Sequence, residues 1–189
     1  MPFVQVLVDG KGPFTFGIDT GTGTQALVSP ALVESLGLAR TGEAEAGDPS
    51  GRGARTLPLV KVGRLSVAGV EFRDVTAAVY EASQADGRCD GILGFLLFRE
   101  WLLTLDHPAA RMVLAQGRLT ASADGTVVPF RAPDGVPLID LGVGGETLPA
   151  IVDTRGLGLA VPASQAERLA LVGEPVVVGS GDTGSRARS

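Results

Sequence analysis

The feature that most constrains this 189-residue chain is a repeated segment in which an apolar stretch ends in Asp-Thr. The first copy covers residues 16–23 and contains Asp19, and the second covers residues 150–156 and contains Asp153. Each copy predicts a strand that presents a carboxylate at its end, in a turn. Two such carboxylates facing each other can share one proton and activate a water molecule. The repeat therefore indicates a paired-carboxylate site.

The similarity between the two copies extends well beyond this motif. The matched segments are 4–8 with 137–141, 29–38 with 162–171, and 47–55 with 181–188. A repeat of this length predicts a duplicated lobe rather than a solenoid of small units. We expect a first lobe at 1–116, a linker at 117–125, where apolar periodicity gives way to small polar residues, and a partial second lobe at 126–189.

Composition predicts that these lobes are built from strands. Hydrophobic residues make up 44% of the chain, and 27 glycines and 12 prolines divide them into short runs, which is typical of short strands joined by tight turns. A helix is expected from Pro30 to about residue 36, closed by Gly37. The expected strands are 3–8, 14–18, 25–29, 57–62, 64–67, 70–72, 75–80, 101–105 and 112–114, with a polar hairpin tip at 40–55 and a short helix at 95–100.

Several functional classes are disfavoured. A net charge of −5 without a basic cluster argues against nucleic acid and against an anionic membrane surface, and no apolar run is long enough for membrane insertion. With one histidine and one cysteine, the sequence has no zinc-like ligand spacing, and His107 is interpreted as part of a turn. No leader-like segment opens the chain, so we expect either a cytoplasmic protein or an exported one whose leader is absent here.

Taken together, residues 17–22, the glycine-rich hairpin and residues 90–98 resemble the retropepsin-like aspartic peptidases of the bacterial aspartyl-protease type. The resemblance covers residues 3–115 as a complete copy and 135–189 as a partial one. It implies an all-β fold: a pepsin-like or retropepsin-like closed barrel lobe with short helices, plus a partial second copy of that lobe. It also implies that the first Asp-Thr-Gly strand crosses the segment at 92–94 in a ψ-shaped loop, beneath a flap formed by the hairpin.

The same resemblance implies hydrolysis of a peptide or protein substrate by water held between two aspartates, with no metal, no cofactor and no covalent intermediate. Threonine hydroxyls would orient the catalytic turns, and glycines would let the substrate backbone approach and the flap move. The implied residues are Asp19 and Asp153 for catalysis; Thr20, Gly21, Thr22 and Thr154 for the catalytic turns; Gly51, Arg52 and Gly53 for the flap; and Ile92, Leu93 and Gly94 for the crossing segment.

The second copy departs from this pattern at Arg155, which stands where the first copy has Gly21. We expect its guanidinium either to crowd the substrate or to pair with the adjacent carboxylates and lower their pKa. The chain ends at Ser189, inside the counterpart of the flap, so it is expected to be part of a longer protein or to carry an incomplete second lobe. The second aspartate of the pair could come from Asp153 or from Asp19 of another copy in a homodimer.

Two other functions are consistent with parts of this sequence. A pseudo-peptidase would keep the fold as a peptide-binding or dimerisation module without catalysis, and Arg155 motivates that alternative. Residues 17–24 also resemble the first phosphate loop of actin-like ATPases and sugar kinases. That fold needs a much longer chain and later nucleotide-binding segments, for which the sequence has no counterpart.

Overall fold

The computed structural model describes residues 1–47, 55–80, 89–120, 122–124, 126–156, 158–159 and 161. Short strands dominate these residues, and none of the helices found in them is long and apolar enough to cross a membrane. The elements are β1 (Phe3–Val8), β2 (Lys11–Asp19), β3 (Ala26–Val28), α1 (Pro30–Leu36), β4 (Arg40–Ala46), β5 (Arg55–Val67), β6 (Val70–Val79), β7 (Gly91–Gly94), the 3-10 helix η2 (Phe95–Phe98), β8 (Leu102–Asp106), β9 (Arg111–Ala115), β10 (Leu138–Val143) and β11 (Glu146–Ile151).

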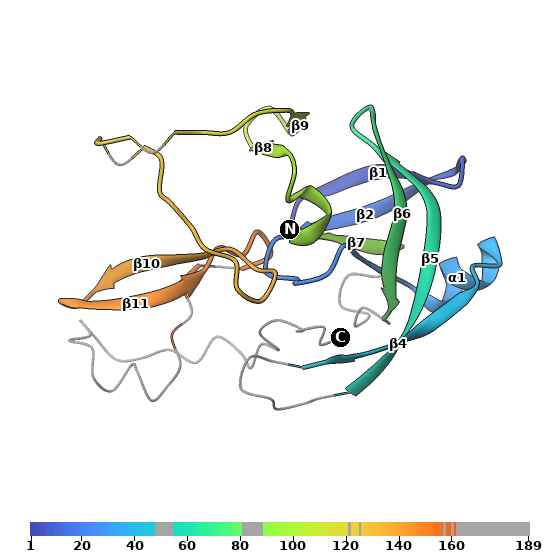
Figure 1. Cartoon of the computed structure of the whole chain (residues 1–189). Coiled ribbons are helices and arrows are strands. Elements are labelled where there is room, and N and C mark those ends of the chain that lie inside the picture. The colour runs from blue at the N-terminus through green and yellow to red at the C-terminus, as the bar shows by residue number, and fades with distance from the viewer. Residues whose placement is uncertain are drawn as a thin grey trace.

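Six strands close into a barrel, in the order β1-β2-β7-β3-β6-β5, and pairing of β1 with β5 joins the two ends (Figure 1). Strand β4 extends the sheet from β5. Closure leaves the barrel strands without a free edge, which protects them from pairing with other chains. The all-β, closed-barrel lobe expected from the sequence is confirmed.

The barrel interior is filled by alternate residues along the strands, whose side chains face inward. Val6 and Val8 of β1 face inward together with Phe16 and Ile18 of β2, while Phe3 and Leu7 on the other face of β1 are exposed. This period of two follows from the pleat, which points successive side chains to opposite sides. The hairpin β8–β9 lies against the same core. The buried end of β2 is the part that carries Asp19.

Two expectations about strands were wrong in detail. The predicted break at residue 63 and the breaks between 70 and 80 do not interrupt the strands, because β5 and β6 pair along nearly their full lengths. One irregularity remains opposite Gly63, where Asp74 has a φ of 54°. Residues 40–46, expected as part of a hairpin tip, form β4 and pair antiparallel with β5, with a register shift between Arg40 and Gly42.

The expected helix at Pro30 is confirmed as α1. The Ser29 hydroxyl accepts a hydrogen bond from the Leu32 backbone N–H at 3.1 Å, Pro30 occupies the first turn, and Gly37 ends the helix at φ 65°. The second short helix is the 3-10 turn η2, shorter than the range 95–100 expected.

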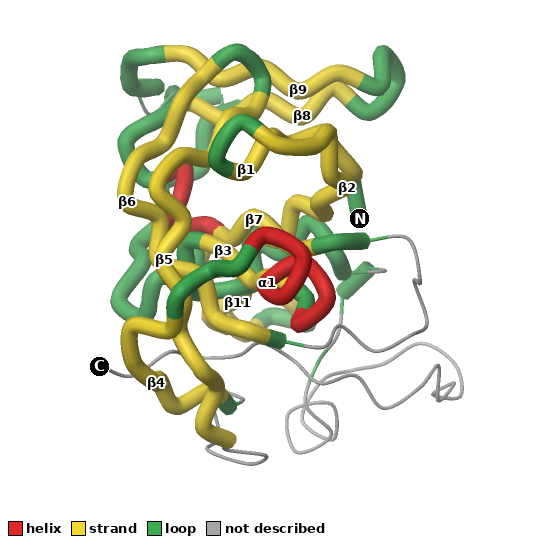
Figure 2. The backbone as a smooth tube through the Cα atoms, turned by 90° about the vertical axis from the view of Figure 1, so that its right-hand side faces the viewer, coloured by secondary structure: helices red, strands yellow, loops and turns green. Residues whose placement is uncertain are grey.

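Beyond β9 the described chain returns toward the barrel through segments without strands and then forms the hairpin β10–β11 (Figures 1 and 2). Val143 and Glu146 pair at the hairpin end, and Leu138 pairs with Ile151 at its base. The base is the end that leads into Asp153. The division into lobes at 116 and 126 stays a prediction.

Candidate active site

Asp19 lies at the end of β2, where this strand runs parallel to β7. Ile18 is aligned with Leu93, and Asp19 with Gly94. A side chain at position 94 would collide with the carbonyl of Thr24, so only glycine lets the loop after Asp19 pack on β7. The segment Ile92, Leu93 and Gly94 thus lies directly beside the aspartate strand, and the ψ-shaped crossing that the resemblance implies for it stays a prediction.

The Asp19 side chain is only 5% exposed and is held by its own turn. Its Oδ1 accepts a hydrogen bond from the Gly21 backbone N–H at 2.9 Å, and its Oδ2 accepts one from the Thr22 hydroxyl at 3.0 Å. These two bonds fix the plane of the carboxyl group inside the turn. Gly21 and Thr22 thus hold the Asp19 carboxyl group, and the catalytic role implied for this turn stays a prediction.

The turn after β2 is joined to the turn after β11 by a reciprocal set of hydrogen bonds. The Thr20 N–H donates to the Thr154 hydroxyl at 3.2 Å, and the Thr154 N–H donates to the Thr20 hydroxyl at 3.1 Å. Each hydroxyl also donates across the join, Thr20 to the Val152 carbonyl at 2.5 Å and Thr154 to the Ile18 carbonyl at 2.8 Å. The two repeats thus meet through an approximately symmetrical contact.

This contact brings the carboxyl group of Asp153 up to the first turn. A Cβ at position 21 would lie 2.9 Å from the Asp153 Cγ and 3.1 Å from its Oδ2. Asp153 Oδ1 accepts the Arg155 backbone N–H at 2.7 Å, the counterpart of the bond from Gly21 to Asp19. Unlike Asp19, Asp153 is exposed to solvent. Gly21 is needed here because any side chain would occupy the space of the opposite carboxylate.

The surroundings raise the pKa of Asp19 above its usual value of 3.8. Burial is the largest cause, because it penalises the charged form, and the negative charge of Asp153 is the second. The hydrogen bonds from Thr22 and Gly21 act in the opposite direction. The pair is asymmetric: Asp19 is buried and its pKa is raised, whereas Asp153 is exposed to solvent.

One expectation for Arg155 was that its guanidinium pairs with the adjacent carboxylates. Its backbone N–H binds Asp153, but in the described part of the chain its guanidinium forms no ion pair, and its side chain is exposed. The expectation that it lowers the pKa of the neighbouring carboxylates does not hold for Asp19, whose pKa is raised. The predicted flap residues Gly51, Arg52 and Gly53 lie outside the described residues.

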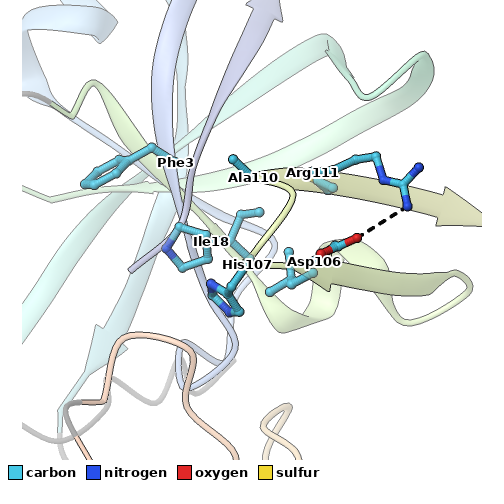
Figure 3. A pocket seen from close by; sticks show the side chains of 9 residues that line it. Phe3, Ile18, Asp106, His107, Ala110 and Arg111 are labelled. Atoms are coloured by element: carbon cyan, nitrogen blue, oxygen red, sulfur yellow. Dashed lines mark hydrogen bonds and ion pairs between the residues drawn. The ribbon is translucent and has the colours of Figure 1, made fainter.

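A hollow of about 200 Å³ is lined in part by Ile18, the residue before Asp19 (Figure 3). Phe3, Ile18 and the turn between β8 and β9 line it, including His107. His107 sits in that turn, as predicted, with its carbonyl bound to the Ala110 N–H. Neither aspartate lines the hollow, so it is separate from the paired-carboxylate site. No group of three or more potential metal ligands gathers among the residues the structure describes.

Sequence reasoning missed one segment that touches the site. The Asp134 carbonyl lies against Gly23 in the loop after Asp19, and Gly135 lies against Leu96. The available signal was Pro-Asp-Gly at 133–135, which predicts a turn. That signal says nothing about what the turn packs against.

Comparison with known families agrees with this geometry. The model of the aspartyl protease family matches residues 4–96, which include the strands of the closed barrel except for Phe3, together with Asp19. Asp153 lies beyond the match. No curated protein and no solved structure matches the chain significantly. The closed barrel is therefore a domain of the aspartyl protease family.

Proposed function

We propose that this protein is an aspartic-type endopeptidase whose two catalytic carboxyl groups, Asp19 and Asp153, come from one chain. The observation that carries the proposal is the reciprocal hydrogen bonding of Thr20 and Thr154, which presents both aspartates at one place. A general aspartic peptidase function follows from the family, and the assignment of the pair is our own step.

In the proposed reaction the two carboxyl groups have different tasks. Asp19, buried and with a raised pKa, carries the shared proton and donates it to the carbonyl oxygen of the scissile peptide. The Asp153 carboxylate accepts a proton from the attacking water, whose oxygen bonds to the carbonyl carbon. The resulting tetrahedral diol collapses when Asp153 returns its proton to the leaving nitrogen and Asp19 recovers one from a hydroxyl group. The products are a carboxylic acid and an amine.

The remaining predicted residues support these steps in the proposal. Thr22 and the Gly21 N–H hold the Asp19 carboxyl group, so its reorientation during the reaction is small. Gly51, Arg52 and Gly53 remain the proposed flap that would cover bound peptide and exclude water. No metal and no cofactor enters these steps.

The direct test compares peptide cleavage by the wild type and Asp19→Asn, using a mixed peptide library and mass spectrometry at several acidic pH values. The substitution keeps the shape and removes the ionisable group, so cleavage is expected to fall by roughly three or more powers of ten. Asp74→Asn is the matched control because Asp74 is an exposed carboxylate on β6. Near-normal turnover by Asp19→Asn would refute the proposal.

The alternative is a pseudo-peptidase that binds peptides or dimerises without cutting them. Two observations favour it: Arg155 in place of the motif glycine, and the exposure of Asp153 to solvent. It predicts that the wild type binds peptides without cleaving them and that Asp19→Asn binds them equally well. Titration calorimetry with a library-selected peptide separates these outcomes.

A further inference from the structure

Residues 130–136, which we call the strap, lie across the loop that follows Asp19. The Phe130 ring meets the Phe95 ring edge to face, with 5.7 Å between centroids and an interplanar angle of 84°. Beyond Phe98, the only buried residues in the described chain are Val136 and its neighbour Pro137. In the described part of the chain beyond Phe98, burial is therefore concentrated at the last residue of the strap and the residue after it.

The strap packs closely against the backbone of the loop that follows Asp19. A Cβ at Gly23 would lie 2.8 Å from the Asp134 carbonyl oxygen. Gly135 has a φ of +74°, and a Cβ there would lie 3.2 Å from Leu96 Cδ1 and 3.3 Å from the Gly23 carbonyl oxygen. Glycine is required on both sides of this contact, because a side chain on either would push the strap off the loop.

The strap is also connected to Asp153. The Val152 N–H donates to the Pro137 carbonyl at 2.9 Å, immediately before Asp153. Arg131 exchanges backbone hydrogen bonds with Leu138 at 3.0 and 2.8 Å, and its guanidinium binds Asp140 at 2.8 Å. Arg131 near the start of the strap and Pro137 just after its end thus connect it to β10 and to the residue after β11. Its contacts with Gly23, Phe95 and Leu96 are with the first lobe.

We propose that the strap positions Asp153: docking of Gly135 on Gly23 and Leu96, and of Phe130 on Phe95, sets the distance between the two aspartates. In the described chain, β10 and β11 pair with each other and with no barrel strand. The hairpin that leads into Asp153 therefore needs contacts outside the sheet to hold its place. The inference rests on the proposed pairing of Asp19 with Asp153, and it assigns the strap residues a positioning role without contact with substrate.

The test measures the titration of the Asp19 carboxyl carbon by NMR in the full chain, because that group senses Asp153 whether or not peptide is cut. Asp153 is the ionisable side chain whose charge raises the pKa of Asp19. The variants are Phe130→Ala and Gly135→Ala, with Asp153→Asn as the reference. Gly142→Ala on β10 is the matched control, since a Cβ there would meet nothing within 4 Å.

We expect both strap variants to move the pKa of Asp19 toward its usual value, in the direction of Asp153→Asn, and Gly142→Ala to leave it unchanged. Cleavage by the strap variants should fall by up to about 100-fold, mainly in kcat. Phe130 is 58% exposed, so its truncation should leave the barrel folded even if Gly135→Ala does not. An unchanged Asp19 titration in Phe130→Ala would overturn the proposal.

Combining each strap variant with Asp153→Asn provides a second check. The strap substitution should shift the pKa of Asp19 less in this background, because the charge that it displaces is gone. An equal shift in both backgrounds would show that the strap acts on Asp19 without Asp153, and would also overturn the proposal. A shifted titration in a protein that cuts no peptide would refute the peptidase and leave the strap inference standing.

Discussion

Thr20 and Thr154 accept each other's backbone N–H groups through their hydroxyl oxygens, at 3.1 and 3.2 Å. This exchange links the two repeats directly. Each hydroxyl also donates a hydrogen bond to a carbonyl of the opposite repeat. Replacing one threonine therefore removes an acceptor and a donor at once.

Thr154→Val should loosen this join while keeping the side-chain shape. The Thr20 N–H loses its acceptor and the Ile18 carbonyl loses its donor, so we expect a loss of about 1–3 kcal/mol in the free energy of unfolding. Urea denaturation measures the change. Thr154→Ser retains the hydroxyl and should lose much less; equal losses in the two variants would mean that the hydroxyl is not the stabilising group.

Gly21→Ala tests the space between the aspartates. The added Cβ would lie 2.9 Å from the Asp153 Cγ, so one of the two turns must move. A displacement of about 1 Å at reacting groups can lower kcat/KM by about 100-fold. Steady-state cleavage assays measure the change against Gly142→Ala, where the added methyl group has free space. Wild-type kcat/KM in Gly21→Ala would contradict the described approach of the carboxylates.

The activity should be confined to acidic and mildly acidic pH. The proposed reaction needs Asp19 protonated and its partner ionised, so it operates between the two apparent pKa values of the pair. Burial and the Asp153 charge raise the pKa of Asp19 above 3.8, which extends the working range upward from that value. A pH–kcat profile measures both limbs. A rate that keeps rising above pH 8 would contradict the shared-proton mechanism.

The raised pKa of Asp19 also makes a prediction about stability. The folded protein holds this proton more tightly than the unfolded chain, so its stability falls as pH rises from the unfolded pKa, near 3.8, through the folded one. Asp19→Asn removes this loss. The variant should therefore gain stability relative to wild type as pH rises from 3 to 7, which melting curves across that range measure. A difference in stability between variant and wild type that stays constant with pH would mean that the folded protein does not disfavour the ionised form of Asp19.

The sequence predicted the parts of this protein that depend on local signals. Ser29, Pro30 and Gly37 specified α1, because caps and proline act within one helical turn. The Asp-Thr repeats predicted the two turns that the structure brings together. The continuity of β5 across Gly63 was missed, because it depends on pairing with β6 along the strand.

The parts that sequence reasoning missed at the site depend on contacts between distant segments. Nothing in the Pro-Asp-Gly turn at 133–135 indicates that Gly135 packs on Gly23 and Leu96. The asymmetry between a buried Asp19 and an exposed Asp153 is equally absent from two nearly identical motifs, because burial is set by the surrounding barrel. The predicted role of Arg155 failed at Asp19 for a related reason: the sequence gives its position and not the direction of its side chain.

The measurement that tests the central claim most directly is the activity of Asp153→Asn in the full chain, with the molecular mass determined on the same sample. An intrachain pair predicts that cleavage falls by roughly three or more powers of ten and that the active wild type has the mass of one 19.3 kDa chain. Full activity in Asp153→Asn together with a dimer mass would contradict the account, because it would mean that Asp19 pairs with its own counterpart in a second copy.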